Sequence, residues 1–281
     1  MSRKRANLTD LLNDLTFRKI FDKYKLLGVS AFEWEGLPPG IKSRHIENLL
    51  FSHGRAIFFK DPDMSFMCLK CDDGIGVNVN GDPVQYLATG FGYHEYYDAD
   101  KCVIIENNIL RYATEPFIYF YVNKITEAER TMDVNIKSVK TPIVFSCDDK
   151  SVLTFKQIFQ QVDGNVPALF ADKNITPDSI SAFQTGAKFL GNEIMDYKKS
   201  VDNEVLTFLG YNNLAVDKKE RVNVPEVESN NGVIESFAQM QEDARKEACK
   251  LINSMYGLNM SVKRKGGVTD VPSVDNNEGD N

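Results

Sequence analysis

The sequence predicts a mainly helical α+β protein in which small β-containing modules are attached to long helices. Three observations carry this prediction. Short extended segments separated by turn signals fill residues 61–113. Two long stretches with apolar residues at helical spacing cover residues 115–140 and 183–211, and a third helical stretch covers residues 234–256. The 281 residues are enough for one large domain or two modest ones with a substantial core.

The first 60 residues predict two helices and a strand. Apolar residues at helical spacing indicate a helix through residue 30, with Gly28 placed to end it. The segment "FEWEGLPPG" at 32–40 is predicted to be a turn region, because adjacent prolines disfavour regular structure. Residues 41–53 then form a helix that Gly54 closes, and "RAIFFK" at 55–60 has the pattern of a strand.

Residues 61–113 predict a small, mostly β module. Turn signals such as "DDGIG", "NGDP", "TGFGYH" and "DADK" separate its short extended pieces. The clearest strand is "CVIIENN" at 102–108, which ends in a turn-forming pair of asparagines. This region is therefore expected to fold as a sheet with helical decoration.

The first long helix is predicted to begin at Thr114-Glu115-Pro116, residue types that suit a helix cap and first turn. Its apolar stripe continues for about 24 residues, or roughly 36 Å at 1.5 Å per residue. The stripe consists of Ile118, Tyr121, Val122, Ile125, Ala128, Met132, Ile136 and Val139.

The second long helix, 183–211, is expected to start after "TPDSI", with Pro177 and Asp178 in its first turn, and to run to Gly210. Its apolar residues are Leu190, Ile194, Tyr197, Val201, Val205 and Phe208, at steps of three and four. Polar residues line the opposite side, namely Asn192, Asp196, Lys199 and Asn203. The apolar side is expected to face packing partners.

The remaining segments connect or follow these helices. Residues 142–170 predict a compact strand–helix–strand unit, and residues 212–233 predict a long charged loop without structure of its own. A helix over 234–256 stops at Gly257, and "LNMSVKRK" predicts a short strand. Residues 266–281 are polar, acidic and poor in apolar residues, so a disordered tail is expected.

Composition argues against a membrane protein and a generally basic nucleic-acid binder. The net charge is −7, so any DNA contact must come from local clusters. The longest apolar run, "FIYFYV" at 117–122, is far below the roughly 20 residues that cross a bilayer. No apolar signal core follows the basic N-terminus, and the five cysteines are scattered. We therefore expect a chain made and used on the cytosolic side.

No enzymatic motif emerges from the sequence. The chain has no Walker phosphate loop, no HExxH and no GxSxG elbow, and its histidines are His45, His53 and His94. Cys68 and Cys71 form an isolated CxxC, for which burial as small hydrophobes is favoured over a metal or redox role. The sequence therefore predicts a protein that is not an enzyme and needs no cofactor or metal.

Two short basic clusters are candidates for contacts with phosphate. Arg3, Lys4 and Arg5 sit near the N-terminus, where binding of RNA or DNA and simple solvation are equally favoured. Lys218, Lys219 and Arg221, with Glu220 among them, lie in the predicted loop. In a single copy of the chain this loop would be an ordinary charged surface.

Seven segments in register resemble one protein family. They are "FEWEGLPPGI", "IFFKDPDMS", "KTPIVF", "SVLTFKQIFQQVDGNVPALFA", "LTFLG", "DKKER" and "EACKLINSMYGLNMSVK". Their order and spacing are similar to those of the upper collar proteins of small short-tailed phages of the picovirus type, which are portals or head–tail connectors. The resemblance runs from about residue 3 to residue 264.

The resemblance implies a phage portal fold, assembled as a ring of twelve copies at one capsid vertex. The tilted channel helices would be 115–140 and 183–211, and the α/β clip domain at the narrow end would be 141–182. The β-containing wing would comprise 1–114, with its basic N-terminal arm, and 234–265 would be the C-terminal wing and crown. The predicted loop at 212–233 would hang into the bore as the channel loop.

The resemblance also implies the functional residues. Lys218, Lys219, Glu220 and Arg221 would contact double-stranded DNA, and repetition around a ring would turn them into a collar of positive charge. Helix residues Lys188, Asn192, Asp196, Lys199 and Asn203 would face the channel. The family lysines at positions 184 and 193 are replaced here by Gln184 and Glu193. The channel wall is therefore expected to be neutral to acidic and to favour sliding of DNA.

The implied partners are other copies of the chain, the major capsid and scaffold proteins, a lower collar or tail protein and a packaging ATPase. Arg3, Lys4 and Arg5 match the part of the family that holds a packaging RNA, although DNA, scaffold or capsid protein are alternatives. The implied location is the portal vertex of the virion, reached from the host cytoplasm. The alternative function is a monomeric phage protein that binds nucleic acid through its basic N-terminus and loop.

Overall fold

The computed structural model describes residues 8–139, 143–145, 180–182, 188–213 and 224–265. The chain forms two compact units, of which the first contains residues 1–127 and 197–281 and the second contains residues 128–196. Helices and antiparallel sheets occur together, so the predicted mixed α+β class is confirmed.

The first unit begins with two packed helices, α1 (Leu8–Ser30) and α2 (Ser43–His53). The prediction that Gly28 ends α1 is wrong, because the helix continues to Ser30. Gly28 instead permits close packing, since a Cβ there would lie 3.0 Å from the ring of Phe51 in α2. Gly54 does end α2, with a φ of 77° and its N–H donated to the carbonyl of Leu50.

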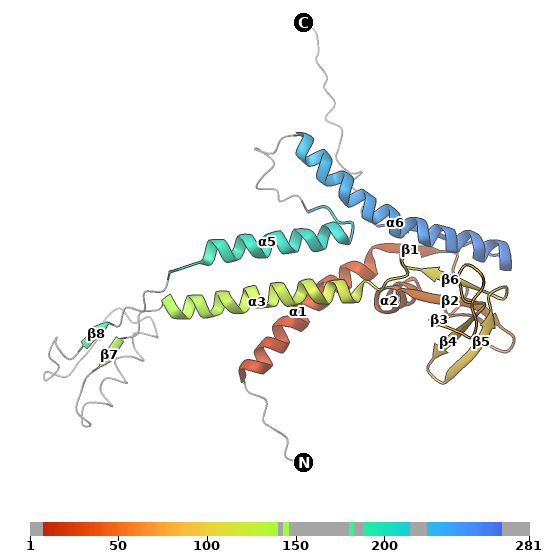
Figure 1. Ribbon diagram of the computed structural model, residues 1–281, viewed down its shortest axis with the longest axis horizontal. Coiled ribbons are helices and arrows are strands. Elements are labelled where there is room, and N and C mark those ends of the chain that lie inside the picture. Colours follow the sequence, from red (N-terminus) through yellow and green to blue (C-terminus); the bar gives the residue numbers. More distant parts are fainter. Residues whose placement is uncertain (1–7, 140–142, 146–179, 183–187, 214–223, 266–281) are drawn as a thin grey trace, which may run out of the picture. The chain divides into compact units, whose positions relative to one another are not determined.

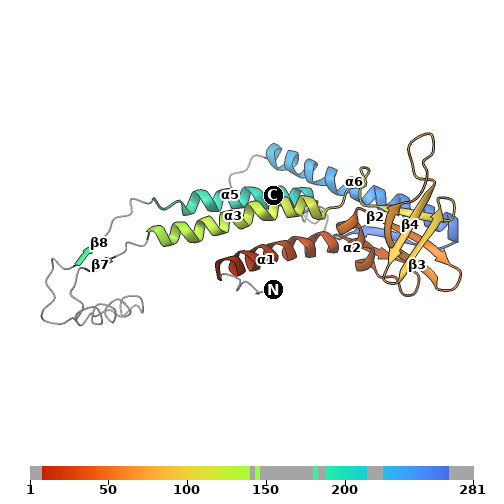
Figure 2. The ribbon, with the colours of Figure 1, turned by 60° about the horizontal axis from the view of Figure 1, so that its bottom comes forward.

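A five-stranded antiparallel sheet follows α2, in agreement with the predicted β module. Its strands are β2 (Arg55–Asp61), β3 (Ser65–Asp73), β4 (Gln85–Gly90), β5 (Tyr93–Asp98) and β6 (Cys102–Glu106). Their order in the sheet is β5-β4-β3-β2-β6, with β2, β3 and β4 visible side by side in Figure 2. The predicted strands at 55–60 and 102–108 correspond to β2 and β6.

A second, two-stranded sheet joins distant parts of the chain. Strand β1 (Phe32–Glu35) pairs antiparallel with β9 (Ser261–Arg264), so that Phe32 lies opposite Arg264. The prediction of a turn region over residues 32–40 is therefore wrong for its first four residues. The partner strand lies more than 200 residues away in the sequence, and local turn signals carry no information about such a pairing.

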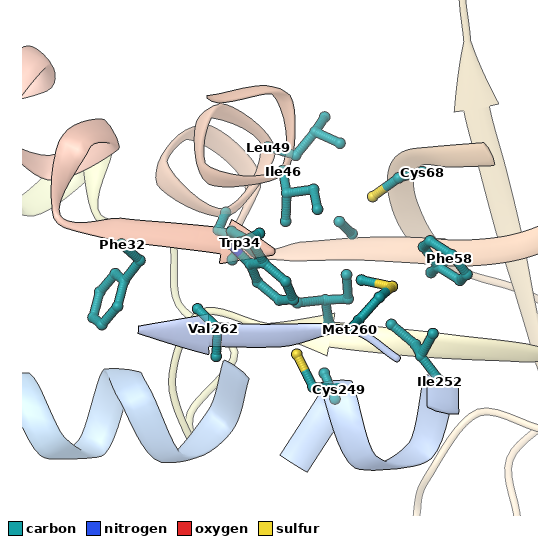
Figure 3. Close-up of a cluster of buried hydrophobic side chains, with 14 of the residues drawn as sticks. Phe32, Trp34, Ile46, Leu49, Phe58, Cys68, Cys249, Ile252, Met260 and Val262 are labelled. Atoms are coloured by element: carbon teal, nitrogen blue, oxygen red, sulfur yellow. The ribbon is translucent and has the colours of Figure 1, made fainter. Parts of the chain in front are cut away.

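The main core of the first unit is formed by this small sheet, strands β2, β3 and β6 of the five-stranded sheet and helices α2 and α6 (Val224–Tyr256). Figure 3 shows the buried side chains that converge there from β1, α2, β9 and α6, including Trp34, Ile46, Ile252 and Val262. Cys68 and Cys249 are buried in the same cluster. The core thus fastens the C-terminal helix and strand to the N-terminal part of the chain.

A second core in this unit holds four helices together, since Phe51 of α2 is also buried in it. Ile118, Val122 and Ile125 of α3 (Glu115–Val139) are buried with residues of α5 (Gly191–Phe208) and with Tyr24 of α1. The contributing residues of α5 and its C-terminal end are Val201, Val205 and Leu209. In this unit α3 and α5 run side by side (Figures 1 and 2), each turning its predicted apolar stripe toward the other.

The second unit contains strands β7 (Ile143–Phe145) and β8 (Ile180–Ala182), which pair antiparallel with Ile143 opposite Ala182. The predicted helix and second strand of the 142–170 unit lie outside the described residues, as does the predicted start of the second long helix at 183–187. Within the described residues, that helix begins at Gly191. Residues 188–190, which were predicted to be helical, lie before it.

Contacts with α3 explain this late start. The side-chain amide of Asn135 donates to the carbonyl of Lys188 at 2.8 Å, and its oxygen accepts the N–H of Leu190 at 2.9 Å. These bonds hold residues 188–190 outside the helix, and the carbonyl of Leu190 then accepts the first helical bond from Ile194. Lys188, predicted to lie on the channel-facing helix, is consequently outside α5.

The start of α6 also differs from the prediction. The loop predicted over 212–233 is wrong for its last ten residues, because α6 begins at Val224. Proline is the second residue of the helix, a position where the missing N–H costs no helical hydrogen bond. The predicted ends of the later elements are confirmed, with Gly257 at a φ of 65° after α6 and with β9 following it.

Candidate nucleic-acid interface

The polar face of α5 contains the predicted channel-facing residues. Asn192, Asp196, Lys199 and Asn203 are all exposed, and their spacing of four, three and four places them along one side of the helix. The single positive and single negative charges in this set balance each other. The face formed by these four residues is therefore polar and without net charge.

The other predicted contacts with nucleic acid lie outside the described residues. They are the loop residues Lys218, Lys219, Glu220 and Arg221, and the N-terminal residues Arg3, Lys4 and Arg5. What the structure does describe is the base of the loop, formed by the end of α5, residues 209–213 and the beginning of α6.

The end of α5 is a Schellman motif. The N–H of Tyr211 donates to the carbonyl of Leu206 at 2.8 Å, and the N–H of Gly210 donates to the carbonyl of Thr207 at 3.0 Å. Gly210 has a φ of 77°, which a glycine adopts without strain. The helix therefore ends at a defined point, and the chain leaves it in a fixed direction.

Several further contacts fasten this end to the rest of the first unit. A Cβ on Gly210 would lie 2.8 Å from the Cβ of Ala238, so α6 packs directly on the Gly210 backbone. Arg264 of β9 donates to the carbonyl of Gly210, and the Tyr211 hydroxyl donates to the carbonyl of Leu27 in α1 at 2.9 Å. The chain thus enters residues 214–223 from a rigid starting point.

The two ends of the loop base are joined by a group of residues that we call the asparagine bridge. It consists of Asn203, Thr207, Asn213 and Asn230. The amide nitrogen of Asn213 donates to the carbonyl of Asn203 at 3.1 Å and to the hydroxyl of Thr207 at 2.7 Å. The amide oxygen of Asn213 accepts a hydrogen bond from Asn230 of α6 at 2.7 Å. The sequence analysis missed this bridge, although its flanking asparagines are visible in the sequence.

The asparagine bridge borders an open cavity of about 420 Å³. Aromatic side chains from α3, α5 and α6 line one part of it, and polar side chains of α5 line the rest. The lining residues are Tyr121, Ser200, Asn203, Glu204, Thr207, Phe208, Asn213, Asn230 and Phe237. Burial, and then the charge of Glu204, raise the pKa of Tyr121 above its ordinary value.

A polar contact between α1 and α5 fixes the helix that bears the interface. Lys23 lies 2.8 Å from a carboxylate oxygen of Asp202, and the buried Tyr24 hydroxyl donates to the same oxygen. Burial alone would raise the pKa of Asp202, but the hydrogen bonds from Lys23 and Tyr24 outweigh it and hold this pKa below its usual value. The pKa of Tyr24 is raised far above its ordinary range, mainly by burial and to a smaller extent by the hydrogen bond to Asp202 and the charge of that residue.

A buried ion pair holds α6 in place, and the sequence analysis missed it as well. Arg245 of α6 forms a two-point contact with Glu47 of α2, at 2.9 Å and 2.8 Å. Arg245 also donates to the carbonyl and side-chain oxygens of Asn107, while the indole N–H of Trp34 donates to Glu47 at 2.8 Å. Neither partner carries a distinctive local signal, since their positions in the sequence are 198 residues apart.

The described residues hold no cluster of potential metal ligands. Among them, no group of three His, Cys, Asp or Glu side chains is placed to hold a metal ion. Cys68 and Cys71 are buried as expected for small hydrophobes, and burial raises the pKa of each thiol to about 12. No helix within the described ranges has the length and apolar character to span a bilayer.

Comparison with known proteins identifies one family over nearly the whole chain. The family model described as Phage Connector (GP10) matches residues 2–269. Among solved structures, the chain is similar to a chain of the portal and tail of native bacteriophage P68. That match has a TM-score of 0.50 and 16% identity, and it covers 96% of this chain and 94% of that chain. At this identity, the likeness is one of fold.

Two further solved structures give weaker matches. One is an HK97 family phage portal protein from Corynebacterium diphtheriae, with a TM-score of 0.45 and 11% identity over 94% of this chain and 96% of that chain. The other is the neck of an empty GTA particle, with a TM-score of 0.46 and 12% identity over 95% of this chain and 82% of that chain.

Proposed function

This chain belongs to the phage connector (GP10) family and is a head–tail connector of the portal type, and we propose that it forms a twelve-membered ring whose bore conducts double-stranded DNA. Within the family, we assign it to the upper collar proteins of picovirus-type phages. The observation that supports the conduit most directly is the charge-balanced polar face of α5, which ends at a rigidly held loop base.

The helices support ring formation because part of their apolar stripes stays exposed in the single chain. In α3 the stripe is buried at Ile118, Val122, Ile125 and Ala128, half-buried at Met132 and exposed further on, with Ile136 at 46% and Val139 at 37% of full exposure. Phe189, Leu190 and Met195, at and before the start of α5, are also exposed. Neighbouring copies would cover these side chains and gain the free energy of burying apolar surface.

In this ring, Asn192, Asp196, Lys199 and Asn203 face the bore. Twelve copies of a face without net charge give DNA a wall that offers no strong attachment. Lys188, outside α5 but next to it in the chain, contributes positive charge at its start. Such a wall lets a duplex slide, because affinity for DNA rises with the number of phosphates that cations neutralise.

Retention of DNA then falls to the channel loop at residues 214–223, which carries Lys218, Lys219, Glu220 and Arg221. One copy offers three cations, but a ring multiplies them into many transient contacts with phosphate. These contacts resist backward movement of the genome without locking it in place.

The remaining assignments complete the proposal. Residues 1–114 and 234–265 form the wing and crown, 115–140 and 183–211 the channel section, 141–182 the clip domain, and 266–281 an acidic tail. The ring sits at one capsid vertex after assembly in the host cytoplasm. It contacts the capsid and scaffold proteins, the lower collar or tail protein and the packaging ATPase. Arg3, Lys4 and Arg5 hold nucleic acid, in the form of a packaging RNA where the phage has one.

The test reverses the charge of the loop. In Lys218→Glu/Lys219→Glu, rings should assemble normally while packaged DNA leaks from filled particles, measured as nuclease-sensitive genome over time. The matched control is Lys246→Glu/Lys250→Glu, which makes the same change in charge on two exposed lysines of α6. Full retention in the loop variant, or equal leakage in the control, would remove the loop from the retention mechanism.

A further inference from the structure

We propose that a hairpin between β3 and β4 of one copy docks in a groove between α6 and β6 of a second copy. We call the hairpin, residues 74–84, the arm. The α6 groove is defined by Ile104, Ile109, Met240, Ala244, Leu251 and Met255. This contact rests on the proposed function, because it takes place between neighbouring copies in the ring.

The arm is an ordered hairpin. The N–H of Gly74 donates to the carbonyl of Gln85 at 2.9 Å, and the N–H of Asn78 donates to the carbonyl of Asp82 at 2.8 Å. An ion pair of 3.2 Å between Asp82 and Arg111 holds its base. The arm therefore has a defined shape on the surface of the first unit.

This defined shape presents apolar side chains to solvent. Ile75, Val77 and Val79 are 73%, 68% and 102% exposed. Single exposed apolar residues are common, but several that adjoin one another mark a surface for a partner. The three side chains of the arm are such a group.

The α6 groove is an open cavity of about 870 Å³ in the same unit. Within the described residues, β6 is an edge strand of the five-stranded sheet, since it pairs there only with β2. Val103 and Ile104 point to opposite faces of that sheet, yet both line the cavity, so the cavity reaches the free edge of β6. The groove side chains that remain exposed are Ile109, Met240, Leu251 and Met255.

The arm matches the groove in length. Met240 and Met255 lie fifteen residues apart on α6, or roughly 22 Å at 1.5 Å per residue. As extended chain, Ile75 to Val79 spans about 13 Å. All three apolar side chains of the arm can therefore lie within the groove at once.

The charges of the two surfaces are also compatible. Asp243 and Glu247 of α6 and Glu106 of β6 make the lining of the groove acidic. Residues 74–81 carry no charge and include Asn78 and Asn80, whose side-chain amides can donate to carboxylates. In a chain with a net charge of −7, an occupant free of acidic residues avoids repulsion by the groove.

The area is sufficient for a substantial part of an interface. If full burial of one such side chain removes about 60–120 Å² of apolar surface from water, the exposed parts of the arm and groove side chains amount to roughly 300–550 Å². Apolar atoms make up a little over half of a typical interface, so the whole contact would cover roughly 500–1,000 Å². A specific interface needs about 1,000 Å². The exposed stripe of α3 adds to this area.

A second copy is the occupant because the arm does not fill the groove of its own chain, where both surfaces remain exposed. The arm and the groove are different surfaces, so each copy gives an arm to one neighbour and receives an arm from the other. Such head-to-tail contacts close into rings.

Disulfide trapping in assembled, full-length rings tests the contact. In Val79→Cys/Leu251→Cys, oxidation should link each copy to the next and give a ladder of covalent multimers on a non-reducing gel. Neither single variant should give a ladder, since the native cysteines among the described residues are buried. The matched control is Val79→Cys/Leu26→Cys, which places the second thiol on α1 at a leucine that is 69% exposed and should give no ladder.

A charge on the arm provides a second test. Val79→Asp would bring a carboxylate toward Asp243 and Glu247 and should raise the protein concentration of half assembly at least about tenfold, measured by analytical ultracentrifugation. Val79→Ile keeps the apolar contact and should assemble like the unaltered chain. Because Val79 is fully exposed in the single chain, far-UV circular dichroism should be the same for both variants.

Rings that give no ladder, or an equally strong ladder in the control pair, would overturn the arm contact and leave the proposed ring in place. Normal assembly of Val79→Asp would also overturn it. An unaltered chain that stays monomeric would instead refute the proposed ring, on which the contact depends.

Discussion

At the scale of single residues, Glu47 and Arg245 are central to the first unit. Their side chains are only 1% and 2% exposed, and the guanidinium also lies 4.2 Å above the ring of Phe32. Burying two charges is costly, and it is tolerated only where both partners are fully hydrogen-bonded. Here Trp34, Asn107 and the carbonyl of Gln241 complete the set of bonds. This network attaches α6, and with it the loop base, to α2.

The expected consequence is a large penalty for removing one partner. Arg245→Ala leaves the buried carboxylate of Glu47 unpaired and should lower the free energy of unfolding by about 3–5 kcal/mol. Lys250→Ala, in a pair with Glu247 that is exposed on both sides, should change it by less than about 1 kcal/mol. Urea unfolding at one fixed protomer concentration measures both. A small effect of Arg245→Ala would contradict this view of the network.

At the scale of elements, two glycines next to the same loop have opposite roles. Gly210 ends α5 in a left-handed conformation, and α6 packs on its backbone. Gly232 lies inside α6, with no atom within 4 Å of the position that a Cβ would occupy. The first glycine is required by conformation and packing, whereas the second only weakens its helix.

Alanine at these two positions should therefore act in opposite directions. Gly210→Ala should destabilise the protein by about 2 kcal/mol, because a left-handed backbone and a close Cβ contact both oppose the methyl group. Gly232→Ala should stabilise it by about 1 kcal/mol through helix propensity. Urea unfolding measures each change, and far-UV circular dichroism reports the expected gain of helix in Gly232→Ala. The same sign for both variants would contradict the assignment.

At the scale of the whole molecule, the exposed part of the apolar stripe on α3 and the polar face of α5 suggest a chain that is incomplete as a monomer. Ile136 is 46% exposed although it continues a stripe in which Ile118, Val122, Ile125 and Ala128 are buried. In a head–tail connector, such a surface is expected to be covered by neighbouring copies. The net charge of −7 adds repulsion between copies, which favours assembly at moderate salt over low salt.

The purified chain of 31.7 kDa should therefore sediment as a ring of about twelve copies. Ile136→Asp should shift it toward monomers, because the new charge would be buried in the contact between copies. Thr131→Asp places the same charge on an exposed polar position of α3 and should leave the ring intact. Analytical ultracentrifugation and end-on electron microscopy report the outcome. A monomer of the unaltered chain would refute the ring.

The sequence by itself determined the features that depend on local chemistry. The stripe from Ile118 to Ala128 made α3 predictable, and Gly54, Gly210 and Gly257 marked the ends of three helices through their conformational freedom. The polar face of α5 was equally clear from its spacing. The connector family itself was visible in seven short segments, and the match to residues 2–269 confirms it.

Tertiary structure alone decided the features that depend on distant partners. The pairing of β1 with β9, the bond of Asn135 that delays α5 and the burial of Glu47 against Arg245 join residues that are far apart in the sequence, and the asparagine bridge joins two consecutive helices. Local propensity misjudged three of these places, namely Phe32–Glu35, the start of α5 and residues 224–233. At these places, hydrogen bonds that form only in the folded chain outweigh the weak preference of the backbone for turn, helix or loop.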